Sequence, residues 1–251
     1  MTRPPESQRA LNSGPGNLEP VTKKRLVLWD IDHTLVDFSE LGAAWYGTAF
    51  TAATGATLRV HPVFGGRTER ATTTDLLTAN GFEAAEETIQ ALFEALVAES
   101  ERHRHTFAET ARALPGAAEA LAAFAAGGDV VQTLVTGNLP EISRHKLVPF
   151  GLDEHLDLEI GGYGTLSVHR PDLVPHAVGL AAAKHGTEFG ADAVVVIGDT
   201  PNDVRAAVDN GAVSVAVATG HYSAEELLAE GAHTVLPDLT DTDAVRRAVL
   251  G

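Results

Sequence analysis

Residues 26–35 read Leu26-Val27-Leu28-Trp29-Asp30-Ile31-Asp32-His33-Thr34-Leu35. A short apolar run that ends in polar residues is typical of a buried strand followed by a loop. Two carboxylates at the end of such a strand are costly, because burial and mutual repulsion both disfavour their charged forms unless a cation intervenes. The pair therefore predicts a cation site after the first strand. A turn with acidic caps is the alternative.

Further apolar runs recur along the chain, with helical patterns between them. The runs lie at Val130–Val135, Ala193–Ile197 and Val213–Val217, with weaker ones at Leu156–Ile160 and Thr234–Leu236. The helical patterns lie at Ala117–Ala126, Pro140–Phe150, Leu173–His185, Asn202–Asn210, Ser223–Glu230 and Asp241–Leu250. This alternation predicts an α/β fold in which a Rossmann-like parallel sheet is covered by helices on both faces.

The stretch from Val36 to Leu114 breaks the alternation, because it has no clear strand and shows helical periodicity. One amphipathic face comprises Ile89, Leu92, Phe93, Leu96 and Val97, and a second comprises Leu41, Ala44, Trp45, Thr48 and Ala52. We expect an all-helical insert at 36–114 and an α/β core formed by 25–35 and 115–251. Residues 1–24 are rich in Pro, Gly, Ser and Asn and predict a disordered tail.

Composition restricts the function classes. The chain has no Cys, which excludes disulfides, thiolate ligands and a cysteine nucleophile. Its net charge of −16 disfavours binding to nucleic acid and to anionic membranes, so an anionic substrate would need a metal ion or a local basic residue. No apolar run approaches the length of a membrane helix, and the N-terminus lacks the apolar region of a secretory signal. We therefore expect a cytoplasmic protein.

Polar residues follow several of the predicted strands. In open parallel sheets, ligands bind beyond the carboxyl ends of the strands. Asp30 and Asp32 follow the first run, the segment 136–138 follows the second, and the segment 199–203 follows a later one. We expect these groups to meet at one edge of the sheet.

These segments resemble, in order, four motifs of the haloacid dehalogenase superfamily. The first motif, Asp-x-Asp-x-Thr, matches residues 30–34, and the second, a Thr or Ser after a strand, matches Thr136. The third, a basic residue before Pro, matches Arg170, and the fourth, Gly-Asp-x-x-x-Asp, matches residues 198–203. The resemblance covers nearly everything from Leu26 onward. It also implies that the helical insert is a cap of the phosphoglycolate phosphatase-like type.

The resemblance implies a role for each matching residue. Asp30 would be the nucleophile and Asp32 the general acid and base. Mg²⁺ would be held by the Asp30 carboxylate, the Asp32 carbonyl and Asp199, with Asp203 as a further metal-site residue. Phosphate would be bound by Thr136, Gly137, Asn138 and Arg170. The implied substrate is a small phosphorylated metabolite.

Several of these residues have structural alternatives. Thr200 and Asp203 also fit the start of a helix. Thr136 could close a turn, Asn138 could cap the next helix, and Arg170 could be a solvated loop charge. His33 stands where the family often has Gly, so we interpret it as a residue in a left-handed turn whose ring could still line the site. Gly66 and Arg67 are candidates for a substrate-facing cap loop, with a plain turn as the alternative.

Other activities of the superfamily can be compared with the sequence. Dehalogenases lack the second acidic residue, so Asp32 argues against them. Phosphonoacetaldehyde hydrolases are expected to use a cap Lys, and residues 36–114 contain none. A phosphomutase keeps both aspartates and stays an alternative, and a noncatalytic binding module is disfavoured by the intact motif set. The ester hydrolysed and the oligomeric state stay open.

Overall fold

A computed structural model of the chain describes residues 24–38 and 42–251, so all but Lys24 of the predicted tail lies outside these residues, as does Leu41. A six-stranded parallel sheet has the order β5-β4-β1-β6-β7-β8. Its strands are β1 (Arg25–Trp29), β4 (Val130–Thr136), β5 (Gly162–Tyr163), β6 (Val194–Gly198), β7 (Val213–Val217) and β8 (Thr234–Leu236). The central β1 pairs with both neighbours, and Leu26 lies opposite Val131 and Val194.

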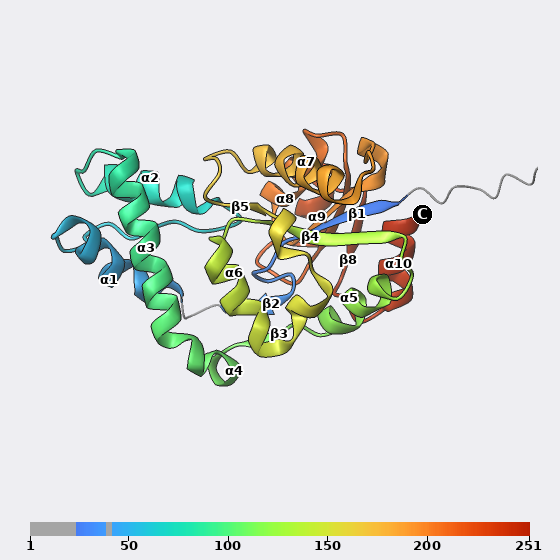
Figure 1. Ribbon diagram of the computed structural model, residues 1–251, viewed down its shortest axis with the longest axis horizontal. Helices are drawn as coiled ribbons and strands as arrows, with labels where there is room; N and C mark the ends of the chain where they lie inside the picture. The colour runs from blue at the N-terminus through green and yellow to red at the C-terminus, as the bar shows by residue number, and fades with distance from the viewer. Residues whose placement is uncertain (1–23, 39–41) are drawn as a thin grey trace, which may run out of the picture.

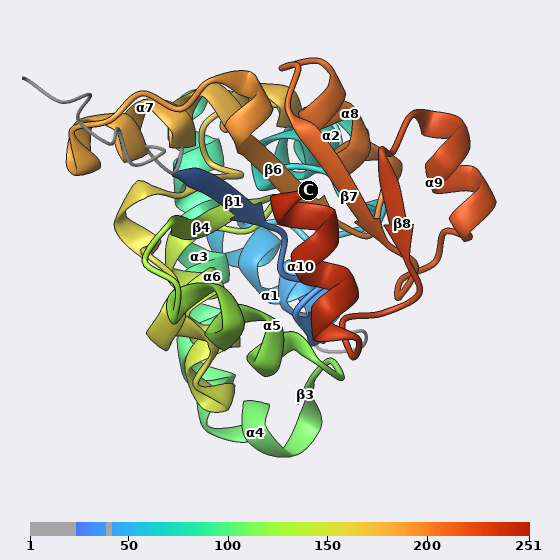
Figure 2. The same ribbon diagram turned by 90° about the vertical axis from the view of Figure 1, so that its right-hand side faces the viewer.

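Helices cover both faces of the sheet, as predicted (Figure 2). Val27 and Trp29 pack with α5 (Ala117–Ala125), α6 (Pro140–Leu147) and α10 (Thr242–Leu250). Leu26 and Leu28 point to the opposite face and pack with α7 (Leu173–His185) and α8 (Pro201–Val208). Helix α9 (Ala224–Glu230) contacts α8 and β7 through Leu227. This alternation along β1 explains why the strand is apolar at every position from Leu26 to Trp29.

The helical insert lies beside the sheet, where α1, α2 and α3 form one unit (Figure 1). It contains α1 (Gly42–Thr54), α2 (Glu69–Ala79), α3 (Glu86–His103) and α4 (Phe107–Thr110), with the 3₁₀ turn η1 (Arg104–Thr106) before α4. Two short strands, β2 (Val36–Asp37) and β3 (Arg112–Ala113), pair antiparallel at its base. The predicted insert is therefore helical except for this two-residue ladder.

The two predicted helix faces of the insert have different outcomes. The face of α3 is confirmed, because Ile89, Leu92, Phe93 and Leu96 are buried. The predicted face of α1 was right at Trp45, which is buried, and wrong at Ala44, Thr48 and Ala52, which are exposed. The buried face of α1 comprises Trp45 together with Tyr46, Ala49 and Phe50. The large aromatic side chains carry more apolar area than the alanines, so they decide which side of the helix packs inward.

The predicted strand at 156–160 was also wrong. This segment follows the 3₁₀ turn η3 (Leu152–His155) and contains the 3₁₀ turn η4 (Leu158–Ile160), and β5 begins only at Gly162. The Asp157 carboxylate accepts a hydrogen bond of 3.2 Å from the Glu159 N–H, which stabilises a local turn. The remaining 3₁₀ turns are η2 (Val148–Phe150), η5 (Arg170–Asp172) and η6 (Ala191–Ala193).

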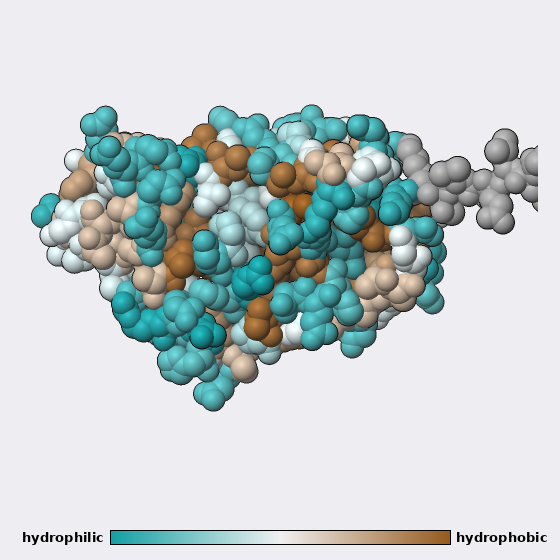
Figure 3. Space-filling model, viewed as in Figure 1, coloured by the Kyte–Doolittle hydropathy of each residue, from teal (hydrophilic) through white to brown (hydrophobic). Residues whose placement is uncertain are grey.

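The surface viewed in Figure 3 mixes hydrophilic and hydrophobic residues, and hydrophilic ones gather over the end of α3 and over α4. This agrees with the exposure of Glu101, Arg102 and Arg104 there. Among the residues described, no helix combines the length and the apolar character that crossing a membrane requires.

Candidate active site

Three carboxylates meet at the carboxyl ends of the central strands. Asp30 follows β1, Asp199 follows β6, and Asp203 lies in the first turn of α8. The Asp30 N–H donates to the Ile197 carbonyl at 2.8 Å, which holds the loop after β1 against β6. One oxygen from each carboxylate lies within 4.8 Å of the others, and all three residues are buried. The expectation that strand ends bring these acids together is therefore met by the geometry.

Arg170 neutralises part of this cluster. Its Nη2 donates to Asp30 Oδ1 at 2.7 Å and lies 2.5 Å from Asp203 Oδ1. The residue is 5 % exposed, so the alternative of a solvated loop charge is wrong. Burial lowers the pKa of Arg170, but the charges of Asp203 and Asp30 raise it by more than burial lowers it, so the net shift is upward. The guanidinium therefore stays charged among the carboxylates.

The donor set of this cluster fits a hard divalent cation. Asp199 Oδ1 is buried without a hydrogen-bond partner, and the contact of Asp203 Oδ1 with Arg170 lacks hydrogen-bond geometry. Burial, then the charges of Asp203 and Asp30, raise the pKa of Asp199. Burial also raises the pKa of Asp203 against the opposing effect of Arg170. One guanidinium does not offset three carboxylates, and clustered carboxylate oxygens are what Mg²⁺ prefers.

Asp203 has a structural role as well. Its Oδ2 accepts hydrogen bonds from the Thr200 N–H at 3.0 Å and from Thr200 Oγ1 at 2.6 Å. The Thr200 hydroxyl in turn accepts from the Asp203 N–H, which completes a capping box at the start of α8. The predicted helix start is thus confirmed, while Asp203 Oδ1 still faces Arg170.

Asp32 lies outside the three-carboxylate group and is held by a lysine. Lys146 Nζ donates to both oxygens of Asp32 at 2.7 Å, and Asn138 Nδ2 donates to Asp32 Oδ2 at 2.8 Å. Burial raises the pKa of Asp32, but the charge and hydrogen bond of Lys146, the hydrogen bond of Asn138 and the charge of His33 together outweigh it, so the net shift is downward.

Sequence reasoning missed Lys146. The signal was present, because Leu139, Ile142 and Lys146 fall on one side of α6, and all three are buried. A lysine on the buried face of the helix that follows Asn138 indicates that an acidic partner is buried beside it, because lysine is rarely buried without one.

The segment 136–138 forms the neighbouring wall. Asn138 does not cap α6, whose N-cap is Leu139, so that alternative is wrong. Its amide instead donates to Thr136 Oγ1 at 2.9 Å and accepts from Lys146 at 2.8 Å. Thr136 is fully buried behind it. A Cβ at Gly137 would lie 2.1 Å from the Arg67 carbonyl oxygen, so the contact with the insert requires glycine there.

His33 adopts the left-handed backbone conformation that its sequence position predicts, with φ 58°. Its carbonyl accepts a hydrogen bond from Thr219 Oγ1, and its ring packs edge-on against His221 with centroids 5.1 Å apart. A Cβ at Gly220 would lie 1.8 Å from Asp199 Oδ2, so the loop after β7 approaches this carboxylate closely. Both histidines line the cavity beside the aspartates.

The loop before α2 closes the site from the insert. Arg170 Nη1 donates to the Gly66 carbonyl at 2.8 Å, and Asn202 Nδ2 donates to the Gly65 carbonyl at 2.8 Å. Gly66 has φ 68°, and Arg67 lines the cavity while pairing with Asp75. The loop therefore docks on the core, which a plain exposed turn would not do.

The family assignment agrees with this geometry. The family model described as haloacid dehalogenase-like hydrolase matches residues 27–207. The chain belongs to the haloacid dehalogenase-like hydrolases. The matched residues include both strand ends that carry the aspartates and the whole helical insert. No match was found among curated proteins.

Solved structures share the fold of this haloacid dehalogenase-like hydrolase. A hydrolase from Pseudomonas syringae is 24 % identical with a TM-score of 0.63, and the match covers 88 % of this chain and 97 % of that one. A candidate beta-phosphoglucomutase from Bacteroides vulgatus is 22 % identical with a TM-score of 0.63 over 91 % of each chain. A predicted phosphoglycolate phosphatase from Haemophilus somnus is 16 % identical with a TM-score of 0.61, and the match covers 90 % of this chain and 99 % of that one.

The aspartates of this hydrolase open into a cavity of about 300 Å³ between the core and the insert. Its core wall carries Asp30, Asp32, Asn138, Lys146, Arg170 and Asp199. Its insert wall carries Trp45, Tyr46, Phe64, Glu69, Thr72 and Leu96. Charged groups thus gather at one end, and mostly apolar groups with a few polar ones line the other.

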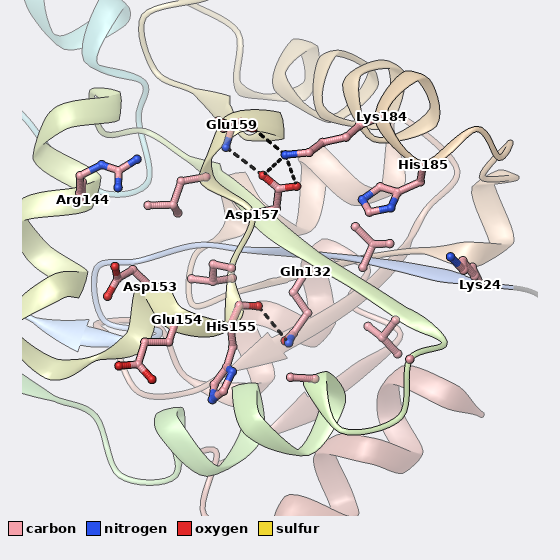
Figure 4. Close-up of a pocket in the computed structure, with 16 residues that line it drawn as sticks. Lys24, Gln132, Arg144, Asp153, Glu154, His155, Asp157, Glu159, Lys184 and His185 are labelled. Atoms are coloured by element: carbon pink, nitrogen blue, oxygen red, sulfur yellow. Dashed lines mark hydrogen bonds and ion pairs between the residues drawn. The ribbon is translucent and has the colours of Figure 1, made fainter.

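A larger hollow of about 610 Å³ lies elsewhere, at the amino ends of β1 and β4 beside Lys24 and Val130 (Figure 4). It shares no lining residue with the aspartate cavity. Lys184 pairs there with Asp157 at 2.8 Å and with Glu159 at 2.7 Å. Ligands of open parallel sheets bind at the carboxyl ends of the strands, so we place the chemistry of this hydrolase in the smaller cavity.

Proposed function

We propose that this chain is a Mg²⁺-dependent phosphatase that hydrolyses a small phosphate monoester. The observation that carries the proposal is the separation of two acidic groups. Asp30, Asp199 and Asp203 converge around Arg170, whereas Asp32 is held apart by Lys146 and Asn138. One group suits a nucleophile with its countercharges, and the other suits a positioned acid and base.

In the first step, a carboxylate oxygen of Asp30 forms a bond to phosphorus while the bond from phosphorus to the leaving oxygen breaks. Asp32, protonated in the complex with substrate, gives that proton to the leaving oxygen, so the leaving group departs as an alcohol. Arg170 donates hydrogen bonds and charge beside Asp30, which lowers the repulsion between the carboxylate and the phosphate.

In the second step, a water oxygen bonds to phosphorus and the bond between phosphorus and Asp30 breaks, releasing inorganic phosphate. Asp32 takes the proton from that water and thereby returns to the protonated form that began the cycle. Mg²⁺, held by Asp30, Asp199 and the Asp32 carbonyl, with Asp203 beside them, would supply positive charge to the transferring phosphoryl group.

The size of the cavity supports a small substrate. A volume of about 300 Å³ is at the lower end of ligand pockets. The docked loop at Gly65 and Gly66 closes one side of this space. A protein or nucleic-acid substrate would not reach Asp30 while this loop stays docked, so we propose a small phosphorylated metabolite as the partner.

The test is a panel of phosphate monoesters assayed for inorganic phosphate with Mg²⁺ and with a chelator. We expect turnover that needs Mg²⁺, and its loss in Asp30→Asn. Asp209→Asn is the matched control, because Asp209 is exposed at the end of α8. Turnover that persists in Asp30→Asn would reject the nucleophile. Conversion of one phosphate ester into an isomer without phosphate release would show a phosphomutase instead.

A further inference from the structure

The insert wall of the cavity carries an acid that the proposed mechanism does not use. Glu69 is the first residue of α2 and lines the cavity. The Tyr46 hydroxyl lies 2.8 Å from each of its carboxylate oxygens, and Thr73 Oγ1 donates to Glu69 Oε1 at 3.3 Å. Tyr46 lines the same cavity. The same wall also carries Thr72 and Arg67, and its apolar part comprises Trp45, Phe64 and Leu96.

The core fixes the position of Glu69. Its N–H donates to the Gly137 carbonyl at 2.8 Å, and the next N–H, from Arg70, donates to the Gly164 carbonyl at 2.9 Å. A Cβ at Gly164 would lie 2.7 Å from the Glu69 nitrogen, so this approach depends on glycine. Gly137 belongs to the proposed phosphate-binding segment. The docked insert therefore holds the carboxyl of Glu69 in a set place relative to the phosphoryl group.

Glu69 also retains capacity to bind a ligand. A carboxylate offers about four acceptor sites, and Tyr46 and Thr73 supply two donors. Basic residues nearby are engaged elsewhere: Arg67, which lines the same cavity, pairs with Asp75, Arg70 pairs with Glu86, and Lys146 pairs with Asp32. Burial raises the pKa of Glu69 to about 7 against the hydrogen bonds of Tyr46 and Thr73. A donor from a ligand would stabilise its charged form.

We propose that Glu69, held by Tyr46, selects substrates whose leaving group carries an ammonium or hydroxyl donor, and disfavours leaving groups that carry a carboxylate. This inference rests on the proposed phosphatase function. The donor would bind Glu69 while the phosphoryl group lies at Asp30. A carboxylate in the same place would face a like charge in a partly buried site, where repulsion is poorly screened. Trp45, Phe64 and Leu96 would contact the carbon atoms between the two ends.

The test uses four esters of similar size: phosphoethanolamine, glycerol phosphate, propyl phosphate and phosphoglycolate. In that order, their leaving groups carry an ammonium, two hydroxyls, no further polar group and a carboxylate. We expect kcat/KM of the wild type to be highest for an ester with a donor and lowest for phosphoglycolate. Whether phosphoethanolamine or glycerol phosphate ranks first distinguishes an ammonium from a hydroxyl donor.

Glu69→Gln removes the charge and keeps the shape of the side chain. We expect the ratio of kcat/KM for phosphoethanolamine to that for phosphoglycolate to fall by roughly tenfold or more, since hydrogen bonds to a charged group are the strong ones. The ratio of kcat/KM for phosphoethanolamine to that for propyl phosphate should fall as well, because propyl phosphate offers no donor to Glu69. Tyr46→Phe should lower the same ratio by a smaller factor, and gives a second measurement if Glu69→Gln folds poorly. Glu87→Gln, an exposed position on α3, is the matched control.

The outcomes separate the two claims. An unchanged ratio in both Glu69→Gln and Tyr46→Phe, or a wild type that prefers phosphoglycolate, would overturn the inference and leave the phosphatase in place. Absence of turnover on all four esters and on nitrophenyl phosphate would overturn the proposed function and the inference with it.

Discussion

Lys146 and Asp32 form a bidentate ion pair, in which Nζ lies 2.7 Å from each carboxylate oxygen. The lysine comes from α6 and also lies over the Phe38 ring, 5.5 Å from its centroid. Only about a tenth of its side chain is exposed, so the pair is shielded from solvent on the lysine side. Lys146 therefore fixes the orientation of the group that we propose moves the proton, without contacting Asp30 in this arrangement.

Replacing Lys146 by Met should slow hydrolysis of esters with alcohol leaving groups by roughly tenfold or more, since a positioned acid is worth on the order of 100-fold. Nitrophenyl phosphate should be slowed much less, because its leaving group departs without a proton. The measurement is the ratio of kcat/KM for the two ester types, which reports formation of the aspartyl phosphate and not its breakdown, a step common to both.

Lys184→Met is the control for that comparison, because Lys184 pairs with Asp157 and Glu159 at the other hollow. Equal slowing of both ester types in Lys146→Met would mean that the lysine acts on folding or binding rather than on Asp32.

Gly66→Ala tests the docked loop. A Cβ at Gly66 would lie 2.2 Å from Thr200 Oγ1, so the loop must move away from Arg170. Gly55→Ala is matched in backbone strain, with φ 72° against 68°, but a Cβ there meets open space. Both variants should lose about 1–3 kcal/mol of stability from the left-handed backbone.

Only Gly66→Ala should lose kcat/KM, by roughly tenfold or more, because misplacing a site by about an ångström costs on the order of 100-fold. Steady-state kinetics on one good ester, with thermal unfolding of both variants, provides the comparison. Similar losses of activity in the two variants would show that loop docking does not matter for turnover.

The sequence predicted where the aspartates meet because two simple rules act together at strand ends. Buried parallel strands are apolar on both faces, as β1 is from Leu26 to Trp29, so their ends are visible as the first polar residues. Parallel strands then bring those ends to one edge. Asp30 and Asp199 are 169 positions apart in number, yet β1 and β6 are direct neighbours.

The misses came from choices that only packing decides. The face of α1 depended on whether Tyr46 and Phe50 or the alanines turn inward, and helical spacing allows both. Glu69 was also missed, because its position depends on the Gly137 and Gly164 carbonyls, which come from distant loops. No local pattern around Glu69 indicates those contacts.

Mg²⁺ should stabilise the wild type through the aspartate cluster. At 100 times the dissociation constant, a single site adds about 2.7 kcal/mol, which raises Tm by roughly 5–10 °C for a chain of this size. Asp199→Asn should lose this shift. The variant should also be more stable than the wild type without metal, because the amide removes a buried charge that Asp203 and Asp30 repel.

Thermal unfolding with Mg²⁺ and with a chelator measures both effects, and Asp209→Asn provides the comparison. An equal Mg²⁺ shift in wild type and Asp199→Asn would place the metal elsewhere.

The pH dependence of stability should reveal the buried state of Glu69. Burial raises its pKa from 4.5 to about 7 in the folded chain. The hydrogen bonds of Tyr46 and Thr73 and the charge of Lys146 lower this pKa, and the charge of Asp32 raises it. Between these two values the folded state binds more protons than the unfolded state, so Glu69 lowers the free energy of unfolding as pH rises. Glu69→Gln cannot titrate. The variant should therefore gain stability relative to the wild type between about pH 4.5 and 7, and the difference should be constant above that.

Urea unfolding of both chains at pH 5 and pH 8 measures this difference. Asp199 and Asp203 also titrate with shifted pKa, but they are present in both chains, so their contribution cancels when the two are compared at the same pH. Glu87→Gln should follow the wild type at both pH values, because Glu87 is exposed. If the stability difference for Glu69→Gln were the same at pH 5 and pH 8, Glu69 would titrate alike in the folded and unfolded chains, and its burial against Tyr46 would not exist in solution.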